Sequence, residues 1–326
     1  MQSRPFPTDV TLTAIALAYQ NNAAEMIHKR VLPPVPVISE RFSWLSYPIA
    51  EAFTVPDLEV GRRGRVGEVN FSAEKHESST RDYGLDDVIP ITDIDEAKHA
   101  REQKRSTYNP ETAAVTGLTN LIELGREVRA ARIVENPENY DTGRKVAISN
   151  ANDKFSKFDT SDPFGVLNAG MTKPLIYRAN TIAMGQEVWE VIKRHPRLIK
   201  AVKGAPTEDG AINRQQFADL MEIERDRLLI GVSMVNSAAR GQPANLVKVW
   251  GNFIALLFVD NQKQAPDDNI LTWGFTAELG NRLAGSIHDP HVGIRGGSRI
   301  RVAEQVHELV CAKSLGYLIQ NPIAAG

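Results

Sequence analysis

The chain has 326 residues, 42% of them apolar and 24% charged, and its 38 basic and 40 acidic side chains leave a net charge of −2 at pH 7. This apolar content suffices for a large core without a disulfide or a metal. The near-neutral balance disfavours sequence-specific DNA binding, because proteins that neutralise many phosphates are more basic.

The single cysteine and the apolar runs restrict the compartment. Cys311 has no second cysteine with which to form an internal disulfide, which fits a reducing compartment. Its apolar neighbours indicate a buried strand thiol rather than a nucleophile. The densest apolar run, FIALLFV at 253–259, is too short to cross a membrane, and the first residues lack the apolar segment of a signal peptide. We therefore expect synthesis in the cytoplasm and no membrane partner.

The N-terminal region predicts a helix followed by an extended segment. Within residues 11–27, apolar side chains recur at helical spacing, at Leu12, Ile15, Ala16 and Tyr19. The next residues, VLPPVPV at 31–37, contain three prolines that favour extended backbone. We expect this segment to cross a surface rather than to contribute to a core.

Residues 54–92 indicate two extended stretches that are charged throughout. Val66, Val69 and Phe71 are too sparse to build a core, and a two-stranded ribbon alone in water is marginally stable. A hairpin here therefore needs contacts from outside itself. Within it, GRRGR at 61–65 fits a solvated or subunit-contacting turn better than a phosphate-binding patch. The chain contains no GxxxxGK[ST] nucleotide loop.

The clearest local signal predicts a long helix over residues 109–135. Asn109 and Pro110 supply a capping residue and a first-turn proline, and Asn136-Pro137 ends the helix. At 1.5 Å per residue it would be about 40 Å long. One face carries an apolar stripe. Another face carries three arginines with two acidic residues as possible i,i+3 partners: Arg126, Arg129, Arg132, Glu123 and Glu127.

The segment NTIAMGQEVWEVIKRHP at 180–196 predicts a short strand followed by a helix. Pro196 disfavours helical backbone at His195, so this histidine is expected at the helix C-terminus. A protonated ring is favourable there because of the helix dipole. No neighbouring residue in the sequence resembles a nucleophile or an orienting acid, so a helix end is preferred over an active site.

Two loops carry potential metal ligands at spacings that fit a metal poorly. Residues 149–163 contain Asp153, Asp159 and Asp162 without EF-hand spacing, which favours a solvated loop. Residues 285–297, GSIHDPHVGIRGG, contain His288 and His291 around an aspartate, but no third ligand can be assigned. A glycine-rich turn is the preferred interpretation of this second segment.

The C-terminal half predicts a central sheet with helices packed against it. A helix is indicated at 212–223, and dense apolar runs indicate strands at 228–235, 247–250, 253–259 and 271–276. Two further strand-like segments are RIRVAEQVHELVCAK at 299–313 and SLGYLIQNPI at 314–323. A turn and a short strand are expected earlier, at 140–149.

Five segments, in this order, resemble the tailed-bacteriophage major capsid (coat) protein family, which has the Hong Kong 97 capsid fold. They are the opening helix with VLPPVPV, the charged ribbon, NPETAAVTGLTNLIELGREVRAARIVENPENY at 109–140, NTIAMGQEVWEVIKRHPRLIKAVKG at 180–204, and SLGYLIQNPI. The resemblance covers about residues 8–322 and rests on order and spacing, because the family lacks a short catalytic signature.

The resemblance implies an α+β phage capsid fold with five parts. These are an N-arm at 1–40, a ribbon at 41–92 with an extended E-loop hairpin, and a P-domain at 93–179 with spine helix 109–135. An A-domain at 180–285 would hold a central sheet flanked by helices, and C-terminal strands at 286–326 would return to the P-domain.

The resemblance also implies a structural role rather than an enzyme. Many copies, as hexamers and pentamers, would self-assemble into an icosahedral phage head that encloses double-stranded DNA and contacts it weakly and non-specifically. Further implied partners are a portal protein and a possible decoration protein. Because the arm begins almost at Met1, either the scaffolding is a separate protein or this chain is not a precursor. The location would be the virion capsid, after synthesis in the host bacterial cytoplasm.

No catalytic, cofactor-binding or metal-binding residue is assigned from the sequence. The candidates for subunit contacts are Arg62, Arg63, Arg65, Lys75, Arg126, Arg129 and Arg132. Lys75 is the only lysine of the ribbon, and no asparagine and glutamate can be matched to it for a covalent crosslink.

Two other functions stay open at this stage. An encapsulin-like nanocompartment shell would share the fold and enclose an enzyme cargo. A soluble α/β enzyme would use His288, His291 and nearby acids, and it would need a pocket with convergent polar groups.

Overall fold

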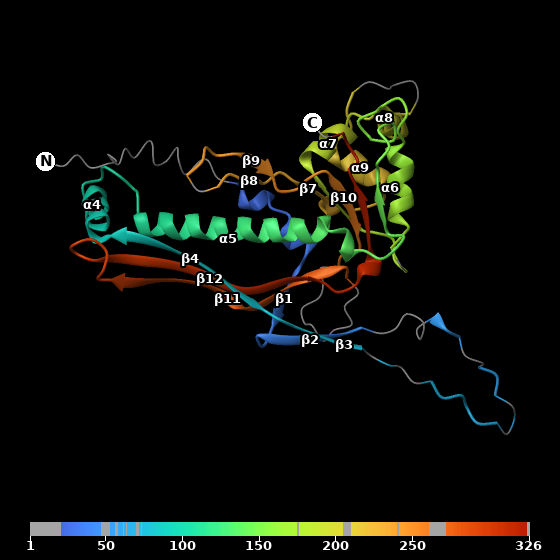
Figure 1. The fold of residues 1–326 in the computed structure, drawn as a ribbon, viewed down its shortest axis with the longest axis horizontal. Coiled ribbons are helices and arrows are strands. Elements are labelled where there is room, and N and C mark those ends of the chain that lie inside the picture. The colour runs from blue at the N-terminus through green and yellow to red at the C-terminus, as the bar shows by residue number, and fades with distance from the viewer. Residues whose placement is uncertain are drawn as a thin grey trace.

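The structure is a computed structural model that describes residues 21–46, 53–55, 58–60, 62, 64–69, 72, 74–174, 176–204, 210–239, 241–260 and 272–324. Helix α5 (Pro110–Glu135) runs along the length of the molecule (Figure 1). Asn109 accepts a hydrogen bond from the backbone N–H of Glu111, and Pro110 begins the helix. The predicted long helix is therefore confirmed at both ends.

A four-stranded sheet lies against α5 (Figure 1). Its strands, in spatial order, are β1 (Pro34–Val37), β11 (Gly274–Asp289), β12 (Gly297–Val310) and β4 (Arg81–Pro90). β1 pairs with β11 in parallel, and the other pairs are antiparallel. Part of the helix–sheet contact is apolar, formed by Ala114, Leu118, Ile122, Ile300 and Val302.

The opposite face of this sheet forms a second apolar cluster at the end where β1 joins it. There β1 and β2 (Arg41–Ser46) pack Val35, Val37 and Phe42 against Phe275 and Leu309. The prediction that VLPPVPV is extended is confirmed, but the prediction that it stays out of a core is wrong. The valines between the prolines alternate onto the buried side of the strand.

A five-stranded sheet forms the second body of the protein. Its order is β5 (Lys145–Ala147), β13 (Gly316–Gln320), β10 (Phe253–Leu257), β6 (Thr181–Gly185) and β7 (Leu228–Gly231). Four helices pack beside it (Figure 1): α6 (Pro163–Met171), α7 (Gln186–Ile192), α8 (Pro196–Lys203) and α9 (Arg214–Leu220). β10 is buried on both faces, because Ile254 and Leu256 belong to one core cluster and Phe253, Ala255 and Leu257 to another. The predicted central sheet with flanking helices is confirmed, but two of the strands assigned to it lie elsewhere. Residues 247–250 overlap β9 (Leu246–Lys248), which pairs with β8 (Met234–Asn236) in a separate two-stranded sheet, and residues 271–276 overlap the start of β11 in the four-stranded sheet.

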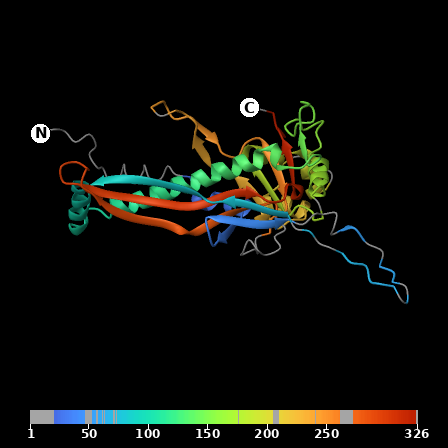
Figure 2. The same cartoon turned by 60° about the horizontal axis from the view of Figure 1, so that its bottom comes forward.

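The charged ribbon projects away from both sheets (Figures 1 and 2). Its base is an antiparallel pair of β2 with β3 (Glu74–Ser79). The sequence predicts instead that the two extended stretches of 54–92 pair with each other. Residues 81–90 leave the ribbon and become the edge strand β4, with its backbone paired to β12.

The remaining elements are short, except for α4 at one tip of the molecule (Figure 1). They are η1 (Ala23–Glu25), α2 (His28–Val31), α4 (Ile91–Glu102), η2 (Pro137–Asn139), η3 (Arg225–Arg227), η4 (Lys313–Leu315), β8 (Met234–Asn236) and β9 (Leu246–Lys248). Most of the helix predicted at 11–27 lies outside the described residues. The single strand predicted at 228–235 is wrong, because it divides into β7 and β8, which belong to different sheets.

The α-helices in the described part of the chain include none with the length and apolar character that a bilayer crossing requires.

Candidate functional site: a charged junction on the long helix

Glu127 of α5 lies at the centre of a buried cluster of charges and has no exposed surface. Its carboxylate accepts hydrogen bonds from the backbone N–H groups of Ile27 and His28 at 3.1 and 2.9 Å. Trp250 Nε1 donates a third, at 2.6 Å. Burial alone would raise the pKa of Glu127, but these donors and the His28 ring outweigh it and hold the pKa below its ordinary value. One carboxylate thus joins α2, α5 and the segment before β10.

His28 fills the space between Glu127 and a second carboxylate, Glu123. Its Nδ1 lies 2.8 Å from Glu127 Oε2, and its Nε2 lies 3.0 Å from Glu123 Oε2. Glu123 Oε1 also contacts Lys29 Nζ at 2.9 Å and Arg282 Nη2 at 2.7 Å. Burial acts to raise the pKa of Glu123, but the hydrogen bonds from His28, Lys29 and Arg282 lower it far below its ordinary value. Glu123 is therefore an anion across the physiological pH range.

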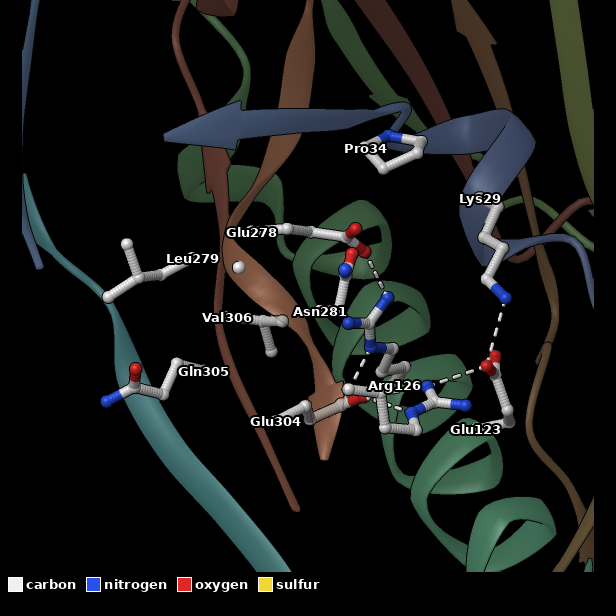
Figure 3. Close-up of a pocket in the computed structure, with 12 residues that line it drawn as sticks. Lys29, Pro34, Glu123, Arg126, Glu278, Leu279, Asn281, Glu304, Gln305 and Val306 are labelled. Carbon is white, nitrogen blue, oxygen red and sulfur yellow. Dashed lines mark hydrogen bonds and ion pairs between the residues drawn. The ribbon is translucent and has the colours of Figure 1, made fainter. Parts of the chain in front are cut away.

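The same face of α5 continues toward the long sheet as a series of ion pairs. Figure 3 shows Arg126 reaching Glu304 of β12 and Glu278 of β11, at 2.7 and 2.5 Å. One turn on, Arg129 donates to both carboxylate oxygens of Glu308. Its guanidinium also lies 3.8 Å above the Tyr83 ring of β4. These contacts fix the rotation of α5 on the sheet.

A bulge in β11 places the last member of the cluster. The pairing of β11 with β12 changes register between Leu279 and Leu283, and Gly280 adopts a φ of +64°. That backbone conformation favours glycine. Arg282 lies in the bulge and contacts both Glu304 and Glu123 at 2.7 Å. The bulge thus links the two ion-pair groups into one network.

The network has the chemistry of a structural junction. A cavity of about 330 Å³ lies beside Arg126 and Arg282, but the carboxylates and cations that line it are paired with one another. Across the ranges that the structure describes, no three histidine, cysteine or acidic residues are grouped as metal ligands. Removing Arg126 would take a counter-charge from the buried Glu304, so these residues serve to hold elements together.

The predicted subunit-contact residues fall into two groups. Arg62, Arg65 and Lys75 are exposed on the ribbon, where Lys75 pairs with Glu77, and Arg63 lies outside the described residues. On α5, Arg132 is exposed, whereas Arg126 and Arg129 contact carboxylates of the same chain. The i,i+3 pairs expected along α5 are wrong. The partners of Arg126 and Arg129 lie on the strands instead.

His195 has a different role from the one its sequence position predicts. It caps the N-terminus of α8, where its Nδ1 accepts from Arg197 N at 3.3 Å, and it is fully buried. Its Nε2 lies 3.0 Å from Ser161 Oγ, whose hydroxyl donates to Lys157 O. Burial lowers the pKa of His195 to about 4. The ring is therefore neutral with its proton on Nε2, and the expected protonated helix C-terminus is wrong.

The histidines near residue 290 do not converge on a metal site. β11 continues through His288 to Asp289, so the glycine-rich turn begins only after Asp289, later than predicted. Asp289 Oδ2 contacts Arg299 Nη2 at 2.6 Å, and its Oδ1 accepts from the backbone N–H of His291. The aspartate thus serves the turn rather than a cation.

Cys311 directly follows β12, and its Sγ lies 2.9 Å from the carbonyl oxygen of Thr272. Burial raises the pKa of this thiol to about 12. Because the thiolate is the reactive species, Ellman's reagent at pH 8 should modify the native protein on the order of a thousandfold more slowly than the urea-unfolded chain. Equal rates in the two states would contradict the buried-thiol interpretation.

Sequence reasoning missed His28, Lys29, Glu278, Arg282, Glu304 and Glu308. A signal for two of them exists in β12. Because alternate residues of a strand face the same side, Glu304 and Glu308 are expected on the same face as the apolar Val302 and Val306. Acidic residues at apolar positions of one strand face indicate basic partners on whatever packs there. Arg126 and Arg129, on one face of the long helix, would have supplied those partners.

The comparisons with known proteins agree with this architecture. No protein-family model matches the chain. It is 38% identical to the major capsid protein of Pseudomonas phage JBD67 over 325 residues, which cover 100% of both chains. It is 27% identical to the major capsid protein of Burkholderia phage BcepMu over 259 residues, 78% of this chain and 77% of that one.

Solved structures share the fold at low sequence identity. A phage-related protein from Bordetella bronchiseptica RB50 superposes with a TM-score of 0.67 at 19% identity, over 96% of this chain and 97% of that one. The capsid of a native GTA particle gives 0.56 at 13% identity, over 94% and 91%. The SrpI encapsulin complex of Synechococcus elongatus PCC 7942 gives 0.53 at 11% identity, over 97% and 96%.

The long helix on its sheet, the second sheet with its helices and the projecting ribbon define a shell-forming protein of the Hong Kong 97 capsid fold. Within this class, the 38% identity to a phage major capsid protein over the full length of both chains decides the family. The chain belongs to the family of phage major capsid proteins and is a structural subunit of a virion shell. The predicted family, fold class and shell function are confirmed.

Proposed function

We propose that many copies of this chain, arranged as hexamers and pentamers, form a closed icosahedral head that encloses double-stranded DNA. The observation that carries the proposal is the row of apolar side chains that the ribbon exposes: Phe53, Val55, Leu58, Val60, Val66 and Val69. Val55 is 79% exposed, and Leu58 and Val66 are 75% exposed, which is costly for a protein that stays monomeric. Contacts with neighbouring copies would remove these side chains from water.

The same proposal assigns a role to each part of the chain. Residues 1–40 act as an N-arm and 41–92 as the ribbon that carries the E-loop. Residues 93–179 form a P-domain, 180–285 an A-domain, and 286–326 strands that return to the P-domain. In support, β12 lies between β4 and β11 along α5, whereas β10, β6 and β7 belong to the five-stranded sheet. β11 spans the bound between the A-domain and the C-terminal strands, and β13 pairs with β10, so residues 286–326 contribute to both sheets.

The proposed partners beyond further copies are a portal protein, a separate scaffolding protein, a decoration protein and the packaged DNA. The near-neutral net charge of −2 supports only weak contact with DNA. The chain would be made in the host bacterial cytoplasm and would function in the virion without an enzymatic activity.

Assembly tests this role of the ribbon. Val66→Asp, and separately the Arg62→Glu and Arg65→Glu pair, should abolish shells in negative-stain micrographs. The protomer's circular dichroism and unfolding midpoint should stay unchanged, because these side chains are exposed in the single chain. Val66→Ile and the Arg62→Lys, Arg65→Lys pair are the matched controls and should assemble normally. Shells of normal yield from the disruptive variants would refute the proposed contacts.

The nanocompartment that the sequence leaves open shares the fold at only 11% identity, so the phage head is the better supported function. The contents of isolated particles separate the two functions. Nuclease-protected double-stranded DNA supports a phage head, whereas a stoichiometric protein cargo without DNA supports a compartment.

A further inference from the structure

We propose that His28 is a pH-dependent latch, which holds the arm root (residues 26–32) against α5 only while the imidazole ring is protonated. The arm root connects the segment near β8 to strand β1 and crosses α5 between them (Figure 1). Closure of the latch fixes the direction in which the arm leaves the protomer.

The geometry around the ring selects its charged form. Nδ1 and Nε2 of His28 each lie within 3.0 Å of a carboxylate oxygen, on Glu127 and Glu123 respectively. A neutral ring carries a proton on only one nitrogen. The unprotonated nitrogen would then lie within 3.0 Å of an anionic oxygen with no proton between them, inside a site where His28 is only 4% exposed. Repulsion there would be screened poorly by solvent.

The other charges around the ring do not reverse this preference. From α2, Lys29 contacts Glu123 but its side chain is 52% exposed, and from β11, Arg282 is shared between Glu123 and Glu304. The remaining neighbours of Glu127, Trp250 and Ser233, are neutral. The two carboxylates are therefore the charges in direct contact with the ring nitrogens.

The direction of the pH effect follows from these contacts. Burial acts to lower the pKa of His28, but the contacts with Glu123 and Glu127 outweigh it and raise the pKa above 6.5. For a raised histidine pKa, the stabilisation is complete below the unfolded-state value and is lost as pH rises through the folded-state value. The latch is therefore closed in mildly acidic solution, and it opens as pH rises through the raised folded-state pKa of His28.

Opening would act on a segment that is otherwise well held. Ile27, Val31 and Leu32 pack in the core shared by the end of α5 and the five-stranded sheet. Two hydrogen bonds join the Asn21 side chain to the backbone of Met234. Loss of the charge at His28 weakens the contacts of the arm root with Glu123 and Glu127. The arm root therefore loosens locally, while the two sheets persist. Any effect of this loosening on shell assembly rests on the proposed function, but the latch itself does not.

Amide hydrogen exchange and histidine NMR on the unassembled full-length protomer test the latch. The ring of His28 should titrate above pH 6.5. Protection of the amides in 27–32, corrected for intrinsic exchange, should fall through the same pH, by about tenfold for each unit by which the pKa is raised. Amides of β10 should keep their protection.

Two variants separate the latch from general destabilisation. Glu123→Gln keeps the shape but removes one anion, so the midpoint should move at least about one pH unit lower. His28→Gln should abolish the fall in amide protection of residues 27–32 with rising pH. His99→Gln, which removes an exposed histidine 3.5 Å from Glu102, is the matched control and should leave this fall unchanged.

Titration of wild-type His28 below pH 6.5, or arm-root protection that does not change with pH, would overturn the proposal even if His28→Gln fails to fold. Shell formation is scored separately by electron microscopy. A working latch without shells would count against the proposed function alone, and shells without a pH step would count against the latch alone.

Discussion

Replacing Glu127 with alanine should lower the free energy of unfolding of the protomer by about 3–5 kcal/mol, the range for breaking a buried ion pair by removing one partner. The truncated side chain would leave the backbone N–H groups of Ile27 and His28 and the Trp250 indole N–H without their acceptor. Each such orphaned donor costs about 1–3 kcal/mol. The His28 ring would also lose the carboxylate at its Nδ1.

Urea unfolding of the unassembled protein measures this loss, with variants that isolate its cause. Glu127→Gln should cost less than alanine, because the amide oxygen still accepts, although its NH₂ group then faces donors. Glu135→Ala, an exposed change at the end of the same helix, should stay within about 0.5 kcal/mol of wild type. Near-equal stability of Glu127→Ala and Glu135→Ala would show that the junction does not hold the elements together.

Local signals in the sequence predict the regular elements well. The ends of α5 are set by Asn109-Pro110 and Asn136-Pro137, which act within a few residues of themselves. β10 is evident because the run of seven consecutive apolar residues at 253–259 is too short for a typical helix and favours a strand buried on both faces. Such features depend on backbone chemistry and apolar burial, and both are visible from a single chain segment.

The pairing of extended segments is less accessible to sequence reasoning. Residues 74–79 and 81–90 are both extended, yet one pairs with β2 and the other with β12. Thr80 separates them, is buried and donates its backbone N–H to Glu40 O. Which partner each strand takes depends on segments far away in the chain. The sequence therefore predicts an extended, charged ribbon, but it does not predict the pairing of β3 with β2 at the base of that ribbon.

The charged junction shows the same limit for side chains. Arg126 and Glu123 are neighbours on a helix face, and their spacing suggests a pair with each other. The structure instead sets each against an ion on another element, because packing brings β11, β12 and α2 to that face. Burial then makes these distant pairs stronger determinants of geometry than a solvated i,i+3 pair, whose contribution is only a few tenths of a kcal/mol.

The protomer should lose about 2–3 kcal/mol of stability through His195 alone as pH falls from about 6.5 to about 4. Burial holds the pKa of His195 at about 4 in the folded protein, whereas the unfolded chain protonates near 6.5. Between these values the unfolded state binds one more proton, so the free energy of unfolding falls as pH falls. Above about pH 7.5 this histidine contributes almost no pH dependence, because the ring is then neutral in both states.

A variant that cannot titrate isolates this contribution from the other groups that change charge in acid. His195→Asn keeps an acceptor for the Arg197 N–H and so preserves the cap of α8, but it loses the contact with Ser161. It should be less stable than wild type at pH 7, and the difference should shrink steadily as urea midpoints are measured down to about pH 4.5. His291→Asn, the same exchange at an exposed turn, should follow the wild-type slope. If the urea midpoints of wild type and His195→Asn fall with pH at the same rate, the buried ring is already charged in the folded state. A ring that is neutral in the folded protein would instead make wild type lose stability faster than the variant as pH falls.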